Sequence, residues 1–370
     1  MDEEIKKIKI KNLDKLYEYR QKLYEKPILK DLFLEVTSRC NARCEHCGSS
    51  CGDFKVKDEV SKENLKKALL DISQHYNAKD ILLNVTGGEP LVRKDLFEIM
   101  NYANKLGFRW GMTSNGMLIN DEIIKKMIET KMETISISLD GLRKTHESFR
   151  NVPGSYDKII NNIKKLQKVP SIKIVQVTTV ANKKNLNELE DLYNLMKELN
   201  IISWRVINVD PIGRAKTNKD ILLDKEEYKW LFNFIKQKRE ENILNVEYGC
   251  SHYLDISMEK EIRDTYFYCT TGLYVASILS NGDIFICPNV ERRKEFIQGN
   301  IKRDSFVDVW ENKFKMFRTD ERLKCEKCSN CSKWKYCLGD SFHTFDFDNK
   351  KPCFCIKDIY ETSKEKISKK

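Results

Sequence analysis

The sequence predicts an α/β protein in which helices cover a parallel β-sheet, either open or closed into a barrel. Three observations support this prediction. Apolar, β-branched runs alternate with segments of helical periodicity from about residue 30 to about residue 210. Gly-rich or polar motifs follow four of these runs, at the strand ends where parallel sheets carry their chemistry. Thirteen cysteines gather in two regions, one early in this body and one after it.

The predicted strands are six short apolar runs. A parallel strand that is covered on both faces requires a nearly continuous apolar run rather than strict alternation with polar residues. Because helical segments separate the runs, their neighbours in the sheet are predicted to be parallel. The runs span residues 32–36, 81–85, 108–113, 134–139, 172–180 and 203–209.

The predicted helices lie between and after these strands. Asp121 and Asn185 stand at positions where helix N-caps are expected. Beyond about residue 245 the helical periodicity fails, and short elements rich in Cys, Asn and aromatic residues predict a small region stapled by metal. The helical segments are residues 62–75, 96–106, 121–131, 156–167, 186–199 and 225–241.

The composition excludes several classes of protein. The 370 residues include 66 Lys+Arg and 56 Asp+Glu, a formal charge of +10, and 41% hydrophobic residues, which is enough for a sizeable core. The absence of a run of about 18 apolar residues and of an N-terminal apolar segment predicts a cytoplasmic protein with no membrane partner. The lysines are dispersed, so we expect a solvated surface and no nucleic-acid partner.

The cysteines indicate metal binding. Cytoplasmic thiols are kept reduced, so a dense and spaced set is typical of metal ligands rather than disulfides. Four cysteines lie between Cys40 and Cys51, and nine lie between Cys250 and Cys355. The sequence therefore predicts two metal-binding regions.

The first region contains Cys40, Cys44 and Cys47 with the spacing C-x3-C-x2-C, directly after the first predicted strand. Three thiolates leave one iron of a cubane cluster open to a substrate or cofactor. Cys51 is an alternative fourth ligand that would close the site. Together with Gly87-Gly88-Glu89-Pro90, one strand later, this motif resembles the signature of the radical S-adenosylmethionine (SAM) superfamily.

The resemblance covers residues 30–210 and implies a partial (β/α)6 TIM-like barrel that binds SAM at an open [4Fe–4S] cluster. Glu89 would accept from the SAM ammonium group, and Arg150 would bind the carboxylate as a bidentate guanidinium. A surface charge at Arg150 and a core packing role for Val180 are the alternatives. The implied cofactor-binding residues are His46, Gly87, Gly88, Glu89, Ser114, Ser138, Arg150 and Val180.

The second cysteine region resembles the SPASM domain, a C-terminal extension of radical SAM enzymes with auxiliary [4Fe–4S] clusters. Structural zinc is the alternative. Ser341 occupies the position of one cysteine of this pattern. One auxiliary cluster would therefore be open to substrate for lack of a ligand, would recruit Cys250, Cys325 or Cys355, or would be absent. We therefore expect one or two auxiliary clusters. The implied metal ligands are Cys269, Cys287, Cys325, Cys328, Cys331, Cys337, Cys353 and Cys355.

The resemblance divides the chain into an N-terminal extension (1–28), a radical SAM partial barrel (29–245) and a SPASM-like iron–sulfur domain (246–370). It implies reductive cleavage of SAM to a 5′-deoxyadenosyl radical, which abstracts hydrogen from a ribosomally made precursor peptide to form a thioether, a carbon–carbon bond or a related product. The implied electron donor is a flavodoxin or ferredoxin, and no catalytic side chain is predicted. The alternatives are a small-molecule or folded-protein substrate, or a non-catalytic iron–sulfur electron carrier.

Overall fold

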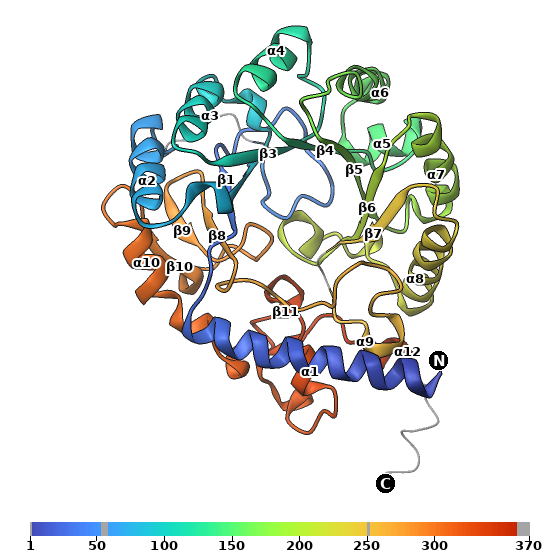
Figure 1. Cartoon of the computed structure of the whole chain (residues 1–370). Coiled ribbons are helices and arrows are strands. Elements are labelled where there is room, and N and C mark those ends of the chain that lie inside the picture. Colours follow the sequence, from blue (N-terminus) through green and yellow to red (C-terminus); the bar gives the residue numbers. More distant parts are fainter. Residues whose placement is uncertain (1, 53–57, 250–251, 361–370) are drawn as a thin grey trace.

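The computed structural model describes residues 2–52, 58–249 and 252–360. Ten strands form one sheet in the order β10-β9-β8-β1-β2-β3-β4-β5-β6-β7 (Figure 1). All pairs from β8 to β7 are parallel, whereas the β8–β9 and β9–β10 pairs are antiparallel. The helices that follow the central strands surround the outside of this curved sheet. The predicted α/β class, a partial barrel with a cysteine-rich C-terminal domain, is confirmed.

The six predicted strands form within one or two residues of their expected ends, and six more strands lie in the second half of the chain. The strands are β1 (Asp31–Glu35), β2 (Leu82–Thr86), β3 (Arg109–Ser114), β4 (Thr134–Ser138), β5 (Ile174–Ala181), β6 (Ser203–Asn208), β7 (Asn245–Tyr248), β8 (Val275–Ile278), β9 (Asp283–Phe285), β10 (Ile297–Asn300), β11 (Phe345–Asp346) and β12 (Lys351–Pro352). The parallel pairing of β8 with β1 places the start of the cysteine-rich region on the barrel sheet itself.

The α-helices are α1 (Glu3–Glu25), α2 (Lys62–His75), α3 (Leu96–Lys105), α4 (Asp121–Glu129), α5 (Arg143–Arg150), α6 (Ser155–Leu166), α7 (Leu189–Glu198), α8 (Lys225–Glu240), α9 (Asp255–Met258), α10 (Phe306–Asn312), α11 (Trp334–Cys337) and α12 (Ile356–Tyr360). Six of them match predicted segments, whereas α1, α5 and the short helices α9 to α12 match none of these segments. No helix in the described residues is both long and apolar enough to cross a membrane.

Two predicted N-caps differ in the structure. The N-cap of α4 is Asn120 rather than Asp121, because Asn120 keeps an extended backbone and its side chain accepts from Ile123 N at 2.9 Å. Asn185 precedes a 3₁₀ turn over Leu186–Glu188 but makes no cap hydrogen bond. Its side-chain amide instead donates to Asp140 O at 2.7 Å and to Val180 O at 3.0 Å, so it ties the end of β4 to the end of β5.

The two faces of the parallel sheet differ in polarity. In β4, Ile135 and Ile137 belong to the main apolar core, while the alternate residues Thr134, Ser136 and Ser138 are half-buried. Because the helices cover the outer face, these hydroxyls lie on the concave inner face (Figure 1). Strand β4 is thus less uniformly apolar than a parallel strand covered on both faces, and its inner face is polar.

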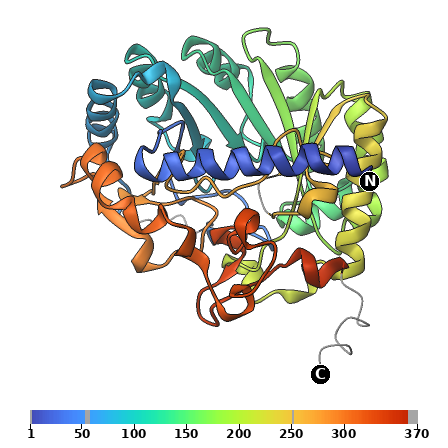
Figure 2. The ribbon, with the colours of Figure 1, turned by 60° about the horizontal axis from the view of Figure 1, so that its bottom comes forward.

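Helix α1 fastens the N-terminus to the cysteine-rich region, and Figure 2 shows it lying across that side of the molecule. Asp320 accepts from Tyr17 Oη at 3.0 Å and from Tyr24 Oη at 2.8 Å. Arg20, which is buried, donates to Lys335 O at 3.0 Å. Helix α1 is therefore part of the folded body.

Candidate cofactor and metal sites

The loop after β1 brings the thiols of Cys40, Cys44 and Cys47 together at the carboxyl end of the sheet. Burial raises the pKa of the Cys40 thiol to about 11, and the neighbouring thiols of Cys44 and Cys47 add to that rise. Three thiols that perturb one another in this way are suited to share a cationic metal centre, because coordination to the metal would stabilise their thiolates.

Cys51 lies beside this group. Its thiol donates to the sulfur of Cys47, and this hydrogen bond lowers the pKa of Cys47 to about 6. Cys51 is itself buried, with 6% of its surface exposed. The structure thus places a fourth thiol next to Cys47, while the spacing motif contains only the other three.

Gly213 and Arg214, which the sequence analysis missed, support the cysteine loop from the segment after β6. Arg214 Nε donates to Cys44 O at 2.6 Å, and its Nη1 donates to Cys51 O at 2.7 Å. Gly213 has φ +55°, and a Cβ there would lie 2.3 Å from Cys47 O. The only signal in the sequence is a glycine just after a strand end, which is typical of any turn.

Glu89 lies at the end of β2 with no exposed surface. Its carboxylate accepts from Asn115 N at 2.8 Å, from Ser114 Oγ at 2.9 Å and from Leu91 N at 3.2 Å. Burial nevertheless raises the pKa of Glu89. Within the described residues it has no ion-pair partner, so the buried carboxylate would be stabilised by a cation.

Gly88 packs against the cysteine loop too closely for a side chain. A Cβ there would lie 2.1 Å from Arg39 O. We therefore expect Gly88→Ala to destabilise the fold by about 1–3 kcal/mol and to reduce SAM cleavage strongly, as measured by thermal melting and 5′-deoxyadenosine yield. At Gly154 a Cβ would meet nothing within 4 Å, although its φ of +73° disfavours alanine, so Gly154→Ala is the control that should lose some stability but retain SAM cleavage. Wild-type activity in Gly88→Ala would contradict the close approach.

Arg150, the last residue of α5, is mostly covered, with 12% of its side chain exposed, and it pairs with the fully buried Asp140. Its Nε donates to Asp140 Oδ2 at 2.5 Å, and its Nη1 donates to Cys44 Sγ at 3.6 Å. Burial raises the pKa of Asp140, but the Arg150 guanidinium outweighs that effect and the pKa ends below its usual value. Asp140 Oδ1 also accepts from Val180 N at 2.8 Å, so one carboxylate joins β4, β5 and α5.

Three further predicted cofactor residues, His46, Val180 and Ser138, lie at the same end of the barrel. The His46 ring stacks on Phe149 with a centroid distance of 4.6 Å and an interplanar angle of 6°. Burial lowers the pKa of His46 to about 3, so its ring is neutral. Val180 packs with Phe149 in a small apolar cluster, and Ser138 ends β4 on the polar inner face. All of these residues therefore share the carboxyl end of the barrel with Glu89.

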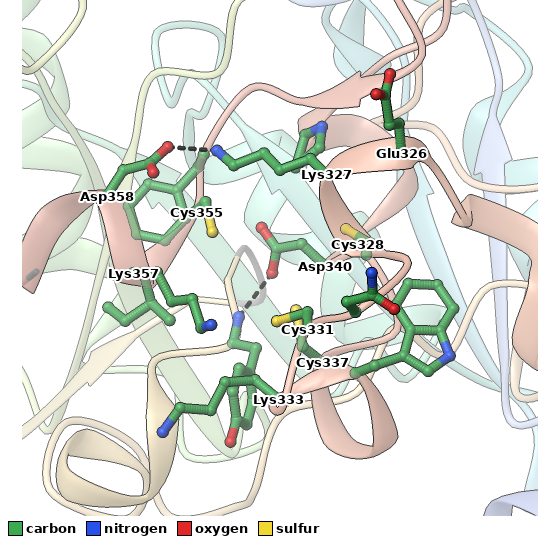
Figure 3. Close-up of a pocket in the computed structure, with 17 residues that line it drawn as sticks. Glu326, Lys327, Cys328, Cys331, Lys333, Cys337, Asp340, Cys355, Lys357 and Asp358 are labelled. Atoms are coloured by element: carbon green, nitrogen blue, oxygen red, sulfur yellow. Dashed lines mark hydrogen bonds and ion pairs between the residues drawn. The ribbon is translucent and has the colours of Figure 1, made fainter. Parts of the chain in front are cut away.

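A second group of thiols surrounds a cavity of about 270 Å³ in the C-terminal region. Figure 3 shows the sulfur atoms of Cys328, Cys331, Cys337 and Cys355 directed toward the space between them. Three lysines (Lys327, Lys333 and Lys357) and three carboxylates (Glu326, Asp340 and Asp358) also line it. Four thiols directed into one cavity are suited to hold an iron–sulfur cluster.

The other cysteines of this region lie apart from the cavity wall. Cys325 hydrogen-bonds with Cys328 but does not line the cavity, whereas Cys353 is exposed. Cys269 and Cys287 form a separate pair, in which the Cys269 thiol helps to raise the pKa of Cys287. Cys250 lies outside the described residues.

The described residues contain no preformed site for a single metal ion such as zinc. Among residues 2–52, 58–249 and 252–360, no three Cys, His, Asp or Glu side chains are placed to hold one ion. An iron–sulfur cubane differs, because each cysteine binds a different iron and the ligands stand farther apart. The four-thiol cavity and the Cys40 group fit a cluster better than zinc.

A buried polar cluster between β6 and the C-terminal region was also missed. His252 Nδ1 lies 2.7 Å from Asp340 Oδ2, and His343 Nε2 lies 3.5 Å from Asp210 Oδ2. Asp340 lines the four-thiol cavity, and Asp210 follows β6. The cluster joins the cavity to the barrel, and its members are too far apart in the sequence for spacing to reveal it.

Sequence profiles of two families match this chain. The profile of the Radical SAM superfamily matches residues 34–196, which include the Cys40 loop and Glu89. The profile of SPASM, an iron–sulfur cluster-binding domain, matches residues 269–332. [4Fe–4S] clusters and SAM are the cofactors of these families.

Individual relatives agree with these matches. The chain is 28% identical over 322 residues to the AdoMet-dependent heme synthase of Methanosarcina barkeri, covering 82% of this chain and 89% of the relative. It is 24% identical over 307 residues to the mycofactocin maturase MftC of Mycolicibacterium smegmatis, covering 82% and 76%. Streptococcus suis SuiB bound to S-adenosylmethionine has the same fold, with a TM-score of 0.67 at 19% identity over 85% of this chain and 73% of SuiB. The chain therefore carries a radical SAM domain followed by a C-terminal SPASM iron–sulfur domain.

Proposed function

We propose that this radical SAM enzyme modifies a ribosomally made peptide by hydrogen abstraction, at a site formed by the cysteine loop, Glu89 and Arg150. When bound, SAM and its [4Fe–4S] cluster supply the 5′-deoxyadenosyl radical that abstracts the hydrogen atom. Cys40, Cys44 and Cys47 would hold this cluster. The described residues leave the buried Glu89 carboxylate without a cation, and the SAM ammonium group would provide one.

Arg150 would hold the carboxylate end of SAM. Its Nε is occupied by Asp140, which fixes the plane of the guanidinium and leaves other N–H groups to donate. The contact with Cys44 Sγ places the same guanidinium beside a proposed cluster ligand. His46, which is neutral and stacked on Phe149, would provide an apolar wall beside the cofactor.

The polar inner face of the barrel supports a peptide substrate and is the observation that carries the proposal. Ser136 Oγ lies 2.7 Å from Thr178 Oγ1, and Gln176 Nε2 donates to Ser203 Oγ at 2.9 Å. Hydroxyl and amide groups both donate and accept, so they suit the alternating N–H and C=O groups of a peptide. The similarity to MftC, whose name describes a maturase, agrees with this choice.

Iron-porphyrin chemistry is the second candidate, because the heme synthase relative is slightly more similar and is covered over more of its length. A porphyrin substrate would be a small molecule with an apolar ring and carboxylate groups. It would require an apolar slot with basic residues. Arg205, whose Nε donates to Thr178 Oγ1 at 3.1 Å, provides one basic group on this face, but the hydroxyl and amide row of β4 to β6 beside it is polar rather than apolar.

The two candidates are separated by a substrate test with the reconstituted enzyme, SAM and a low-potential flavodoxin or ferredoxin, the proposed electron donor. Short Cys-containing or aromatic peptides encoded beside the gene are compared with iron coproporphyrin III. We expect a peptide to lose two hydrogens while 5′-deoxyadenosine forms, as measured by mass spectrometry. Loss of carbon dioxide from the porphyrin, with every peptide unchanged, would contradict the peptide proposal.

A further inference from the structure

We propose that this chain holds a single auxiliary [4Fe–4S] cluster, bound by Cys328, Cys331, Cys337 and Cys355, and that Cys269 and Cys287 form a buried thiol pair without a cluster. The inference rests on the proposed cluster-binding function but not on the choice of substrate. It is carried by the cavity geometry, by the role of Ser341 and by the number of thiols at each place.

The cavity provides a complete ligand set from three short segments. Cys328 ends a 3₁₀ turn, Cys337 ends α11, and Cys355 directly precedes α12. Lys327 forms an ion pair with Asp358, and the nearby thiols of Cys355 and Cys328 help to raise its pKa. Its positive charge would offset part of the negative charge of a cluster with four thiolates.

Cys355 rather than Cys353 completes this set. The Cys355 thiol lines the cavity (Figure 3), and it lies near enough to Cys337 and Cys328 to interact electrostatically with both thiols. Cys353 is exposed and faces the carboxylates of Asp346 and Asp210, which would oppose a thiolate there. The two cysteines therefore have different surroundings although they are close in the sequence.

Ser341 stands where the SPASM pattern has a cysteine, but its hydroxyl is already used. The residue has no exposed surface and caps the 3₁₀ turn Phe342–Thr344 in a reciprocal capping box with Thr344. The two hydroxyl oxygens lie 2.8 Å apart. A serine that ligates iron would have to give up this cap, and an alkoxide is a poorer cluster ligand than a thiolate.

Among the described residues, the Cys269–Cys287 pair supplies only half of a cubane's ligands. The Thr271 hydroxyl hydrogen-bonds to the Cys287 thiol. Cys269 is buried, with 5% of its surface exposed. These are the surroundings of a small buried residue that packs as an apolar group.

Iron analysis of two double variants of the full chain tests the assignment. After anaerobic reconstitution we expect about eight irons per chain, four in each of two cubanes. Cys269→Ala with Cys287→Ala should keep all of them, whereas Cys328→Ala with Cys355→Ala should lose half. About twelve irons in the parent chain, with a loss of a third in the first double variant, would overturn the proposal.

Ser341→Cys provides a test that does not require deleting buried thiols. It restores the missing cysteine of the pattern, but in the described part of the chain no third thiol is among the main groups acting on the Cys269–Cys287 pair, so we expect no gain in iron and a lower melting temperature from the lost cap. A gain of about four irons, with a new cubane signal by Mössbauer spectroscopy, would overturn the proposal. A chain with eight irons that never cleaves SAM would refute the proposed function and leave this assignment standing.

Discussion

Replacing Cys40, Cys44 and Cys47 together by Ala is expected to abolish 5′-deoxyadenosine formation while iron in the C-terminal region remains. The reason is that these three thiols lie in one loop at the carboxyl end of the sheet, beside Arg150 and Glu89, and no other described thiols adjoin both residues. The measurement is liquid chromatography of the products after anaerobic incubation with SAM and dithionite, with iron determined on the same sample.

The matched control is Cys353→Ala, which removes an exposed thiol outside both cysteine groups. We expect this variant to form 5′-deoxyadenosine at the rate of the parent chain. Undiminished SAM cleavage in the triple variant would mean that another cluster binds SAM, and the assignment of the site would be wrong. Loss of all iron in the triple variant would instead indicate that the two regions fold only together.

Most of the barrel could be predicted from the sequence, because its strands and helices are local signals. Each of the six apolar runs, and each helix between them, is specified by consecutive residues, and the observed strands and helices lie at nearly the same positions. The pairing of β8 with β1 could not be predicted in this way. It joins segments more than two hundred residues apart, and Val275–Ile278 is too short to be distinguished from other apolar stretches.

The candidate site was predictable only where a motif has fixed spacing. Cys40, Cys44, Cys47 and Glu89 follow strand ends, so their positions on the sheet follow from the fold class. Arg214 had no such signal, because its role depends on backbone oxygens of the cysteine loop that only tertiary structure brings near. Asp140 stood at a strand end, but its function as the partner of Arg150 required the unexpected helix α5.

Arg150→Ala is expected to weaken SAM binding about tenfold to a hundredfold, since one charge-assisted contact contributes roughly 1.5–3 kcal/mol. It should also destabilise the protein by about 3–5 kcal/mol, because Asp140 has no exposed surface and would be left as an unpaired buried charge. Titration calorimetry with SAM and thermal melting measure the two effects. Arg143→Ala is the matched control, because Arg143 lies on the same helix and pairs with Asp157 at the surface.

The double variant Arg150→Ala/Asp140→Asn separates the two effects. An asparagine removes the unpaired charge, and its side-chain oxygen still accepts from Val180 N, so stability should largely return. SAM affinity should stay low, because the guanidinium is still absent. If the double variant binds SAM like the parent chain, Arg150 only neutralises Asp140 and does not hold SAM. If instead both stability and affinity stay low, the contact of Arg150 with Cys44 Sγ organises the cysteine loop as well.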